Sequence, residues 1–168
     1  MLPQEPFDYW NIIKKRLHFL PQEPFFQEGE IWWCSLGMNI GYEYNGKNIN
    51  YERPVLIICK ISNDMAWVLP ISSQTKEHEF RFLIEEFHSQ VIMSQPRTVS
   101  SRRLLRKIGP LSCDDFCSIC DQIIKILHNT KLRHKAENLG GQRPAVGWIV
   151  YQENYSSSDC IPIFWLFL

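Results

Sequence analysis

A single arginine stands where the chain enters an apolar strand. Arg53 directly precedes Pro54, and Val55–Cys59 behind it is apolar and rich in β-branched residues, which is typical of a buried strand. Proline is tolerated at the start of a strand and forces the residue before it into an extended conformation. Arg53 is therefore expected on stiff backbone at the edge of a core strand. A guanidinium fixed in this way either guards the strand edge as a solvated charge or stabilises negative charge in a ligand.

Three cysteines further along have a spacing that suits metal chemistry. Cys113, Cys117 and Cys120 form a C-x3-C-x2-C pattern, with which radical-SAM enzymes hold an iron–sulfur cluster. Here the pattern lies inside a predicted amphipathic helix, and too little chain follows for a large α/β barrel. Free cysteines commonly act as small buried hydrophobic residues, so core positions are favoured and no metal or cofactor is expected. His128 and His134 slightly strengthen the case for a zinc site, but their spacing from the cysteines is not that of a zinc finger.

The composition is that of one packed globular domain. The chain has 168 residues, of which 45% are hydrophobic and 13% aromatic, enough for a sizeable core and unlike a disordered chain. The formal net charge is zero, so no overall field points to a nucleic-acid partner. The charges are nevertheless unevenly distributed. Five basic residues and no acid lie within 97–107, whereas four acids and one arginine lie within 77–86.

The sequence shows no targeting or membrane segment. The stretch MLPQEPFDYW carries prolines and acids where a signal peptide needs an apolar region. No run approaches the roughly 18–20 apolar residues of a membrane span. We therefore expect a cytoplasmic protein without membrane contact, and six cysteines that are thiols rather than a disulfide framework.

Short strands joined by tight turns are predicted for the middle of the chain. A short amphipathic helix is predicted before them, within 8–20, between two copies of LPQEPF. Period and composition predict five strands, at 30–36, 54–61, 66–71, 79–84 and 91–95. Residues 37–48 hold three glycines and three asparagines, which predicts a loop.

The hydrophobic period changes after these strands. Apolar residues between Phe116 and Leu127 recur at intervals of three and four, which predicts an amphipathic helix. Ser112 is its expected N-cap, with Asp115 a weaker match to the glutamate of a capping box. Short strands closed by one helix predict a mostly β fold with helices, α+β in class, in which a small barrel packs against the C-terminal helix.

These patterns divide the chain into three parts. Residues 1–26 form an N-terminal helix and proline-rich extension, residues 27–130 form the barrel domain, and residues 131–168 form a C-terminal extension without a clear period. The extension begins loop-like and ends on the apolar IPIFWLFL. It fits an added strand pair, an interface element, a poorly folded tail or a shifted reading frame.

Several short patterns, in order, resemble the MazF/PemK family of toxin endoribonucleases. GEIWWCSLGMNIGYEYNGK resembles the family's first strand and its G-x-E-x-x-G loop. RPVLII resembles its second strand, and VLPISSQ the end of its third, usually P-x-[ST]-[ST]. SQPRTVSSRRLLRKIG resembles its Q-x-R segment and short helix. Together these patterns and the predicted C-terminal helix span 29–127.

The resemblance implies a fold and a function. The fold is a compact SH3-like barrel of the CcdB/PemK type, usually a homodimer. The function is that of a toxin in a type II toxin–antitoxin system, which cleaves single-stranded RNA (mRNA) at short sequences without a metal. A cognate antitoxin is expected to wrap the dimer and block the RNA groove. Nucleic-acid binding, of RNA foremost and also of DNA, belongs to the same expectation.

The resemblance also assigns roles to single residues. RNA can be cut without a metal because its own 2′-OH attacks the adjacent phosphate, and the added negative charge on phosphorus then needs a preorganised arginine. Arg53 matches that position, Ser72 matches the family's catalytic Thr/Ser, and Glu43 matches the loop glutamate, a base or an orienting group. The expected RNA-binding residues are Gln95 and Arg97 of the Q-x-R pair, with Ser73, Lys47, Arg102 and Arg103.

Plain structural roles stay open for several of these residues. Ser72 is also a normal turn former, Glu43 can cap its own loop, and the basic stretch can be a solvated face. The chain also departs from the PemK branch, which has an acid at Ser94, an arginine at Ile92 and a histidine at Tyr42. The supported set is therefore the MazF-type arginine with serine or threonine. The alternatives are a gyrase poison of the CcdB type on the same barrel and an RNA-binding protein that has lost activity.

Overall fold

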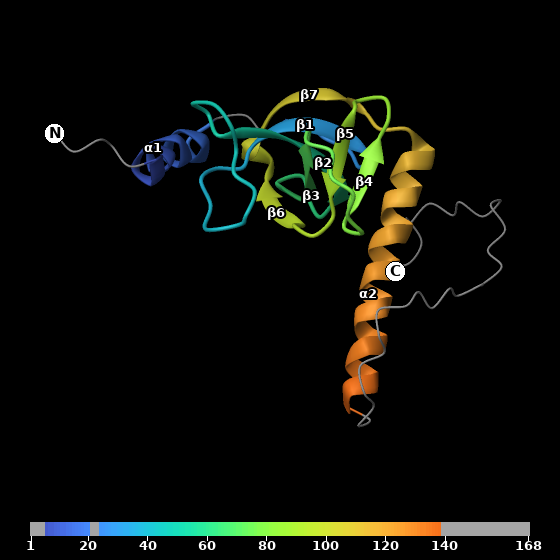
Figure 1. Cartoon of the computed structure of the whole chain (residues 1–168). Helices are drawn as coiled ribbons and strands as arrows, with labels where there is room; N and C mark the ends of the chain where they lie inside the picture. Colours follow the sequence, from blue (N-terminus) through green and yellow to red (C-terminus); the bar gives the residue numbers. More distant parts are fainter. Residues whose placement is uncertain (1–5, 21–23, 139–168) are drawn as a thin grey trace. The chain divides into compact units, whose positions relative to one another are not determined.

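The computed structural model describes residues 6–20 and 24–138 (Figure 1). The chain separates into two compact units, residues 1–128 and 129–168. The predicted division at 1–26, 27–130 and 131–168 stays a prediction.

Two α-helices, seven strands and one 3-10 helix make up the described part of the chain. Their bounds, in chain order, are α1 (Pro6–His18), β1 (Glu30–Ser35), β2 (Glu52–Lys60), β3 (Met65–Ser72), β4 (Arg81–Ile84), β5 (Ser89–Ile92), β6 (Arg97–Ser100), η1 (Ser101–Arg103), β7 (Leu104–Pro110) and α2 (Cys113–Asn138).

Antiparallel pairing joins these strands in the order β4-β5-β3-β2-β1-β7, and β6 pairs with β3 beside this path. The central strand β3 has two partners on one side. Its first residues, Met65 to Val68, pair with β6, and its last two, Ile71 and Ser72, pair with β5. Strands that follow one another in the chain pair at β1–β2, β2–β3 and β4–β5, whereas the pairings β3–β5, β3–β6 and β1–β7 join strands that are not consecutive.

Both faces of the central strands are buried. Val55 and Ile57 of β2 pack in one core cluster with Trp32 and Val68, whereas Leu56, between them, packs in a second. The second cluster is completed by β4, β5 and the first half of α2, which Figure 1 shows beside β4. Ile119 of this helix is fully buried. Two buried faces explain why β2 reads as an unbroken apolar run.

The predicted fold class, mostly β with helices, is confirmed, and so are the first three strands and both helices. The Ser112 hydroxyl oxygen accepts a hydrogen bond from the Asp115 backbone N–H at 3.1 Å, as an N-cap does. The helix α2 continues to Asn138, well beyond Leu127. Among the described residues, no helix is long and apolar enough to cross a membrane.

The entry of β2 differs from the prediction. The strand begins at Glu52, so Arg53 lies within it, opposite Cys34 of β1, and not in front of it. Pro54 is tolerated inside the strand because it pairs only with Trp33 of β1, since pairing with β3 starts at Val55. Arg53 is consequently buried, and the interpretation as a solvated edge charge is wrong.

The basic stretch 97–107 also differs from the prediction. It forms two strands, β6 and β7, and the expected short helix is reduced to the three residues of η1. The strand β7 is an edge strand whose side chains are mostly exposed, so it shows no apolar alternation. The fifth predicted strand lies earlier, at Ser89–Ile92, because the segment after it turns toward β6.

The cysteines of α2 lie partly outside the core. Cys113 is exposed, Cys117 and Cys120 are half-buried, and the buried position between them belongs to Ile119. The core interpretation is therefore wrong for Cys113. Burial raises the pKa of the Cys120 thiol, and nearby Asp121 adds to this shift. In the part of the chain that the structure describes, no group of three or more His, Cys, Asp or Glu residues is arranged to hold a metal ion.

The helix α1 packs against the loop that connects β1 and β2. The Trp10 ring is buried, with its centroid 5.7 Å from that of Tyr51, and the Tyr51 hydroxyl donates to the Pro6 carbonyl at 2.8 Å. Gly37 lies directly beneath this ring, since a Cβ there would approach it to 2.3 Å. The helix thus fixes one side of the 37–51 loop.

A buried carboxylate makes the stability of the sheet pH-dependent. Glu30 accepts hydrogen bonds from Lys107 Nζ at 2.5 Å and Trp32 Nε1 at 2.8 Å. Burial raises the pKa of Glu30, but these bonds together outweigh it, so the pKa lies below its ordinary value of 4.5. A carboxyl with a depressed pKa stabilises the fold above its unfolded pKa, and this contribution is lost as the pH falls through the folded pKa.

Replacing Glu30 by glutamine should therefore lower the free energy of unfolding at pH 7 by about 1–2 kcal/mol. The difference from the unmodified protein should shrink as the pH falls below 4.5, where the unfolded chain takes up its proton. Urea unfolding at pH 7, 4.5 and 3.5 measures both effects. Glu85→Gln, at an exposed glutamate, is the control. A Glu30→Gln loss that stays constant over this range would contradict the explanation.

Candidate functional site

Arg53 is enclosed by groups from three segments. The residue is only 8% exposed. Its Nε donates to the Asn45 carbonyl at 2.7 Å. Nη1 donates to the Ile71 carbonyl at 3.3 Å, and the guanidinium carbon lies 4.7 Å from the centroid of the Tyr44 ring. Burial lowers the pKa of the guanidinium and Tyr44 opposes this shift, but an arginine stays charged at neutral pH. These two hydrogen bonds leave other N–H groups of the fork for an anion.

Tyr44 connects Arg53 to the hairpin of β4 and β5. Its hydroxyl oxygen accepts from Arg81 Nη2 at 2.6 Å, while its ring lies under the Arg53 guanidinium. Arg81 Nη1 also donates to Gln90 Oε1 at 3.3 Å and to the Gln74 carbonyl at 3.2 Å. Sequence reasoning missed Tyr44 and Arg81. The one available signal was that Arg81 is the single arginine within the acidic stretch 77–86.

The loop that carries Tyr44 is held by the segment 95–97. Gln95 Oε1 accepts from the Tyr44 backbone N–H at 2.7 Å, and Gln95 Nε2 donates to the Tyr42 carbonyl at 3.0 Å. Arg97 Nη2 pairs with Glu43 Oε2 at 3.3 Å. The Glu43 side chain is 57% exposed and that of Arg97 20%. The loop glutamate and the Q-x-R pair therefore lie together.

Ser72 lies next to the Arg53 side chain. The residue is buried, and it directly follows Ile71, whose carbonyl accepts from Arg53. The Ser72 hydroxyl oxygen accepts from the Gln74 backbone N–H at 3.2 Å, which is the bond of a turn former. Its proton has no acceptor among the described residues and can be given to a ligand. Ser73, the next residue, is exposed.

The remaining predicted RNA-binding residues are bound into the structure differently. Lys47 is exposed, and its backbone exchanges two hydrogen bonds with Glu52. Arg102 donates from Nη1 to the His18 carbonyl of α1. Arg103 donates to the Ser35 carbonyl at 3.3 Å, and its guanidinium carbon lies 5.3 Å from the Trp10 ring centroid. The two arginines thus hold α1 and the end of β1.

The thiol opposite Arg53 in the sheet is not a nucleophile. Cys34, its partner across β1 and β2, is fully buried, and burial raises the pKa of this thiol to about 12 despite Arg103 and Arg97. A thiol in this state is neutral at physiological pH. The site therefore offers guanidinium, hydroxyl and carboxylate groups, a set suited to an anionic substrate such as a phosphodiester.

Of the three positions that depart from the PemK branch, one belongs to the core. Ile92 is buried at 1% exposure, so the position cannot supply a polar group. Ser94, which precedes Gln95, is exposed, and so is Tyr42 within the loop that Gln95 holds.

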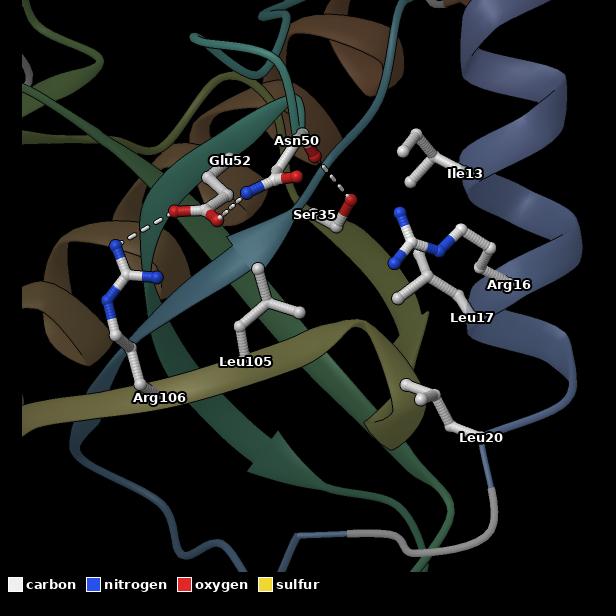
Figure 2. Close-up of a pocket in the computed structure, with 9 residues that line it drawn as sticks. All are labelled: Ile13, Arg16, Leu17, Leu20, Ser35, Asn50, Glu52, Leu105 and Arg106. Atoms are coloured by element: carbon white, nitrogen blue, oxygen red, sulfur yellow. Dashed lines mark hydrogen bonds and ion pairs between the residues drawn. The ribbon is translucent and has the colours of Figure 1, made fainter.

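A separate cavity lies on the other side of β2. Its volume is about 290 Å³, and Figure 2 shows it between α1, β1 and β7. The lining residues are Ile13, Arg16, Leu17, Leu20, Ser35, Asn50, Glu52, Leu105 and Arg106. Glu52 points into it while bonded to Arg106 and Asn50 (Figure 2). Because neighbouring strand residues face opposite ways, the Arg53 site lies apart from this cavity.

Comparison with known proteins places the chain in a family. A profile of the family described as "PemK-like, MazF-like toxin of type II toxin-antitoxin system" matches residues 27–127. No curated protein matches the chain at a significant level.

Solved structures give further, weaker likenesses. An endoribonuclease in complex with its cognate antitoxin from a Mycobacterial species is 13% identical, covers 62% of this chain and 95% of its own, and has a TM-score of 0.47. The MazE-MazF crystal structure from Deinococcus radiodurans is 15% identical over 63% and 96%, with a TM-score of 0.48. The Mycobacterium tuberculosis toxin MazF-mt6 is 18% identical over 56% and 91%, with a TM-score of 0.44.

The assignment rests on the family profile, since the structural scores are low. The profile spans β1 to the first half of α2, and so it includes Arg53, Ser72, the 37–51 loop and the Q-x-R segment. The helix α1 lies outside it. The chain belongs to the PemK-like, MazF-like toxin family of type II toxin–antitoxin systems.

Proposed function

We propose that this protein is a toxin endoribonuclease that cleaves single-stranded RNA, mRNA above all, at short sequences and without a metal ion. The observation that carries the proposal is the setting of Arg53. Its guanidinium is fixed by two backbone carbonyls and the Tyr44 ring, beside the Ser72 hydroxyl, whose proton has no acceptor within the described part of the chain. A preorganised cation next to a hydroxyl donor is what a reacting phosphodiester requires.

The reaction is a transfer within the RNA itself. The 2′-oxygen forms a bond to the adjacent phosphorus, and the bond from phosphorus to the 5′-oxygen breaks in line with it. The 2′-OH proton goes to a base, and the departing 5′-oxygen receives a proton. The products are a 2′,3′-cyclic phosphate and a 5′-hydroxyl, so neither water nor a metal is needed for the cleavage step.

Three side chains have proposed roles in this step. Arg53 donates to the non-bridging phosphate oxygens, where negative charge increases in the transition state. Ser72 donates its hydroxyl proton to the same phosphate. Glu43, exposed and paired with Arg97 at 3.3 Å, accepts or orients the 2′-OH proton.

The partners follow from family membership. One of the similar structures, from a Mycobacterial species, is an endoribonuclease in complex with its cognate antitoxin, and the one from Deinococcus radiodurans is a MazE-MazF structure. We propose that this chain likewise forms a homodimer in the cytoplasm and is neutralised by a cognate antitoxin. Lys47, Ser73 and Arg97 are proposed to contact the RNA backbone, with Arg102 and Arg103 as more distant charges.

The test is a comparison of three substrates in EDTA. The purified chain is incubated with a long single-stranded RNA, the same RNA as a duplex, and single-stranded DNA of the same sequence. We expect cuts at a few short sequences in the single-stranded RNA alone, because only it has both a 2′-OH and freedom to align in line. Binding of the RNA without any cutting would contradict the proposal and favour an RNA-binding protein that has lost activity.

A further inference from the structure

The tip of the 37–51 loop is a tight turn that displays one aromatic residue. The Glu43 backbone N–H donates to the Ile40 carbonyl at 3.2 Å, which closes a four-residue turn. Gly41, at the first central position, has a φ of 60°, a left-handed value that favours glycine. Tyr42 occupies the second central position and is fully exposed.

The backbone of this turn is fixed by two side chains. Gln95 uses its whole amide on it, accepting from the Tyr44 N–H at 2.7 Å and donating to the Tyr42 carbonyl at 3.0 Å. Asn39 Nδ2, from within the loop, donates to the Tyr44 carbonyl at 2.9 Å. The turn is therefore a rigid support and not a loose loop end.

The ring on this support is entirely open to solvent. Tyr42 is 101% exposed, whereas Tyr44, two residues later, lies under Arg53. Glu43, which directly follows Tyr42, forms an ion pair with Arg97. The Tyr42 ring therefore lies beside a neutralised carboxylate and an arginine. A rigid backbone that carries a free aromatic ring next to fixed arginines is a combination that suits single-stranded nucleic acid.

We propose that Tyr42 is a stacking platform for one nucleobase of the bound RNA and that Gln95 positions it. The inference rests on the proposed function and adds to it the residue that holds a base next to the reacting phosphate. Tyr44 contacts Arg53, and Tyr42 is two residues away in the same loop, so a base on Tyr42 and a phosphate at Arg53 belong to nearby nucleotides. The Gln95 amide thus supports the turn instead of reading the RNA.

The experiment measures binding with an RNA that cannot be cut. A fluorescent pool of random-sequence 2′-O-methyl decamers is compared with an abasic 2′-O-methyl decamer, which has the same backbone and no bases. Tyr42→Ala should weaken binding of the pool by about 5- to 100-fold and leave binding of the abasic decamer unchanged. Tyr42→Phe should bind the pool like the unmodified protein, and Tyr42→Leu like Tyr42→Ala, because only the flat ring stacks.

Two further variants separate the platform from its support. Gln95→Met removes both the acceptor for the Tyr44 N–H and the donor to the Tyr42 carbonyl without adding a charge, and it should weaken only the base-dependent part of binding. Ile49→Ala, at another exposed apolar position of the same loop, should change neither. Thermal unfolding of each variant confirms that it is folded.

The inference is overturned if Tyr42→Ala binds the pool normally, if it weakens both ligands equally, or if Tyr42→Leu binds as well as Tyr42→Phe. It is also overturned if Tyr42→Ala changes the protein's oligomeric mass and not its RNA affinity, since Tyr42 would then lie in a protein interface. If Tyr42 contributes base-dependent binding but the protein does not cut natural RNA, the proposed nuclease activity is wrong and the stacking platform stands. If Tyr42→Ala cuts and binds RNA normally, the nuclease activity stands and the stacking platform is wrong.

Discussion

Replacing Arg53 by lysine is expected to lower kcat for RNA cleavage by at least about 100-fold while the protein stays folded. A guanidinium is flat and presents five N–H groups, so it can lie over the Tyr44 ring, bond to Asn45 and Ile71, and still donate to a phosphate. An ammonium is a compact charge that cannot do all of these at once. The loss should appear mainly in kcat, because the charge that attracts the substrate is kept.

The chain offers a closely matched control for this variant. Arg106 also lies over an aromatic ring, 4.8 Å from the Trp33 centroid, and is also bonded to a neighbour, Glu52 at 2.8 Å. It lines the separate cavity (Figure 2) and not the Arg53 site. Arg106→Lys should leave kcat within about twofold. Equal rates for Arg53→Lys and the unmodified protein would remove Arg53 from the mechanism.

Gly46→Ala is expected to have the largest effect on stability, lowering the free energy of unfolding by about 3 kcal/mol. A Cβ at Gly46 would lie 1.7 Å from the Tyr51 carbonyl oxygen and 1.9 Å from its carbon. Both atoms are backbone, so no side-chain movement relieves the clash. Gly46 also follows Asn45, whose carbonyl accepts from Arg53 at 2.7 Å. A backbone displacement at Gly46 should move this carbonyl and therefore reduce cleavage as well.

Gly109→Ala is the control for that substitution. A Cβ at Gly109 would meet nothing within 4 Å, so its effect should stay within about 1 kcal/mol. Urea unfolding and cleavage rates of both variants, measured side by side, test the prediction. If the two glycines respond alike, the 37–51 loop is not packed as tightly as its contacts indicate.

The fold could be predicted best where one local pattern decides the structure. The period and cap of α2 and the apolar runs of β1, β2 and β3 were sufficient for those elements. The strands β6 and β7 could not be predicted, because exposed basic residues on an edge strand carry no alternation. The start of β2 was misplaced because Pro54 normally begins a strand, whereas here it has a ladder partner on one side only.

The candidate site could be predicted only in part, because its members come from distant segments. Arg53, Ser72, Glu43, Gln95 and Arg97 stand in sequence patterns of the family, and the structure brings these five together. Tyr44 and Arg81 are 37 positions apart in the sequence, and only the pairing of β3, β5 and β4 makes them neighbours. No local pattern contains that contact.

The measurement that tests the central claim most directly is the chemistry of the cut ends. A single-stranded RNA with one mapped cleavage site is treated with the purified chain in EDTA, beside the same RNA with a single 2′-O-methyl group on the nucleotide before the cut. The mechanism predicts a 2′,3′-cyclic phosphate and a 5′-hydroxyl from the first RNA, and no cut at that position in the second. A 5′-phosphate end, or normal cutting of the methylated RNA, would show that the 2′-OH is not the nucleophile and would contradict the account.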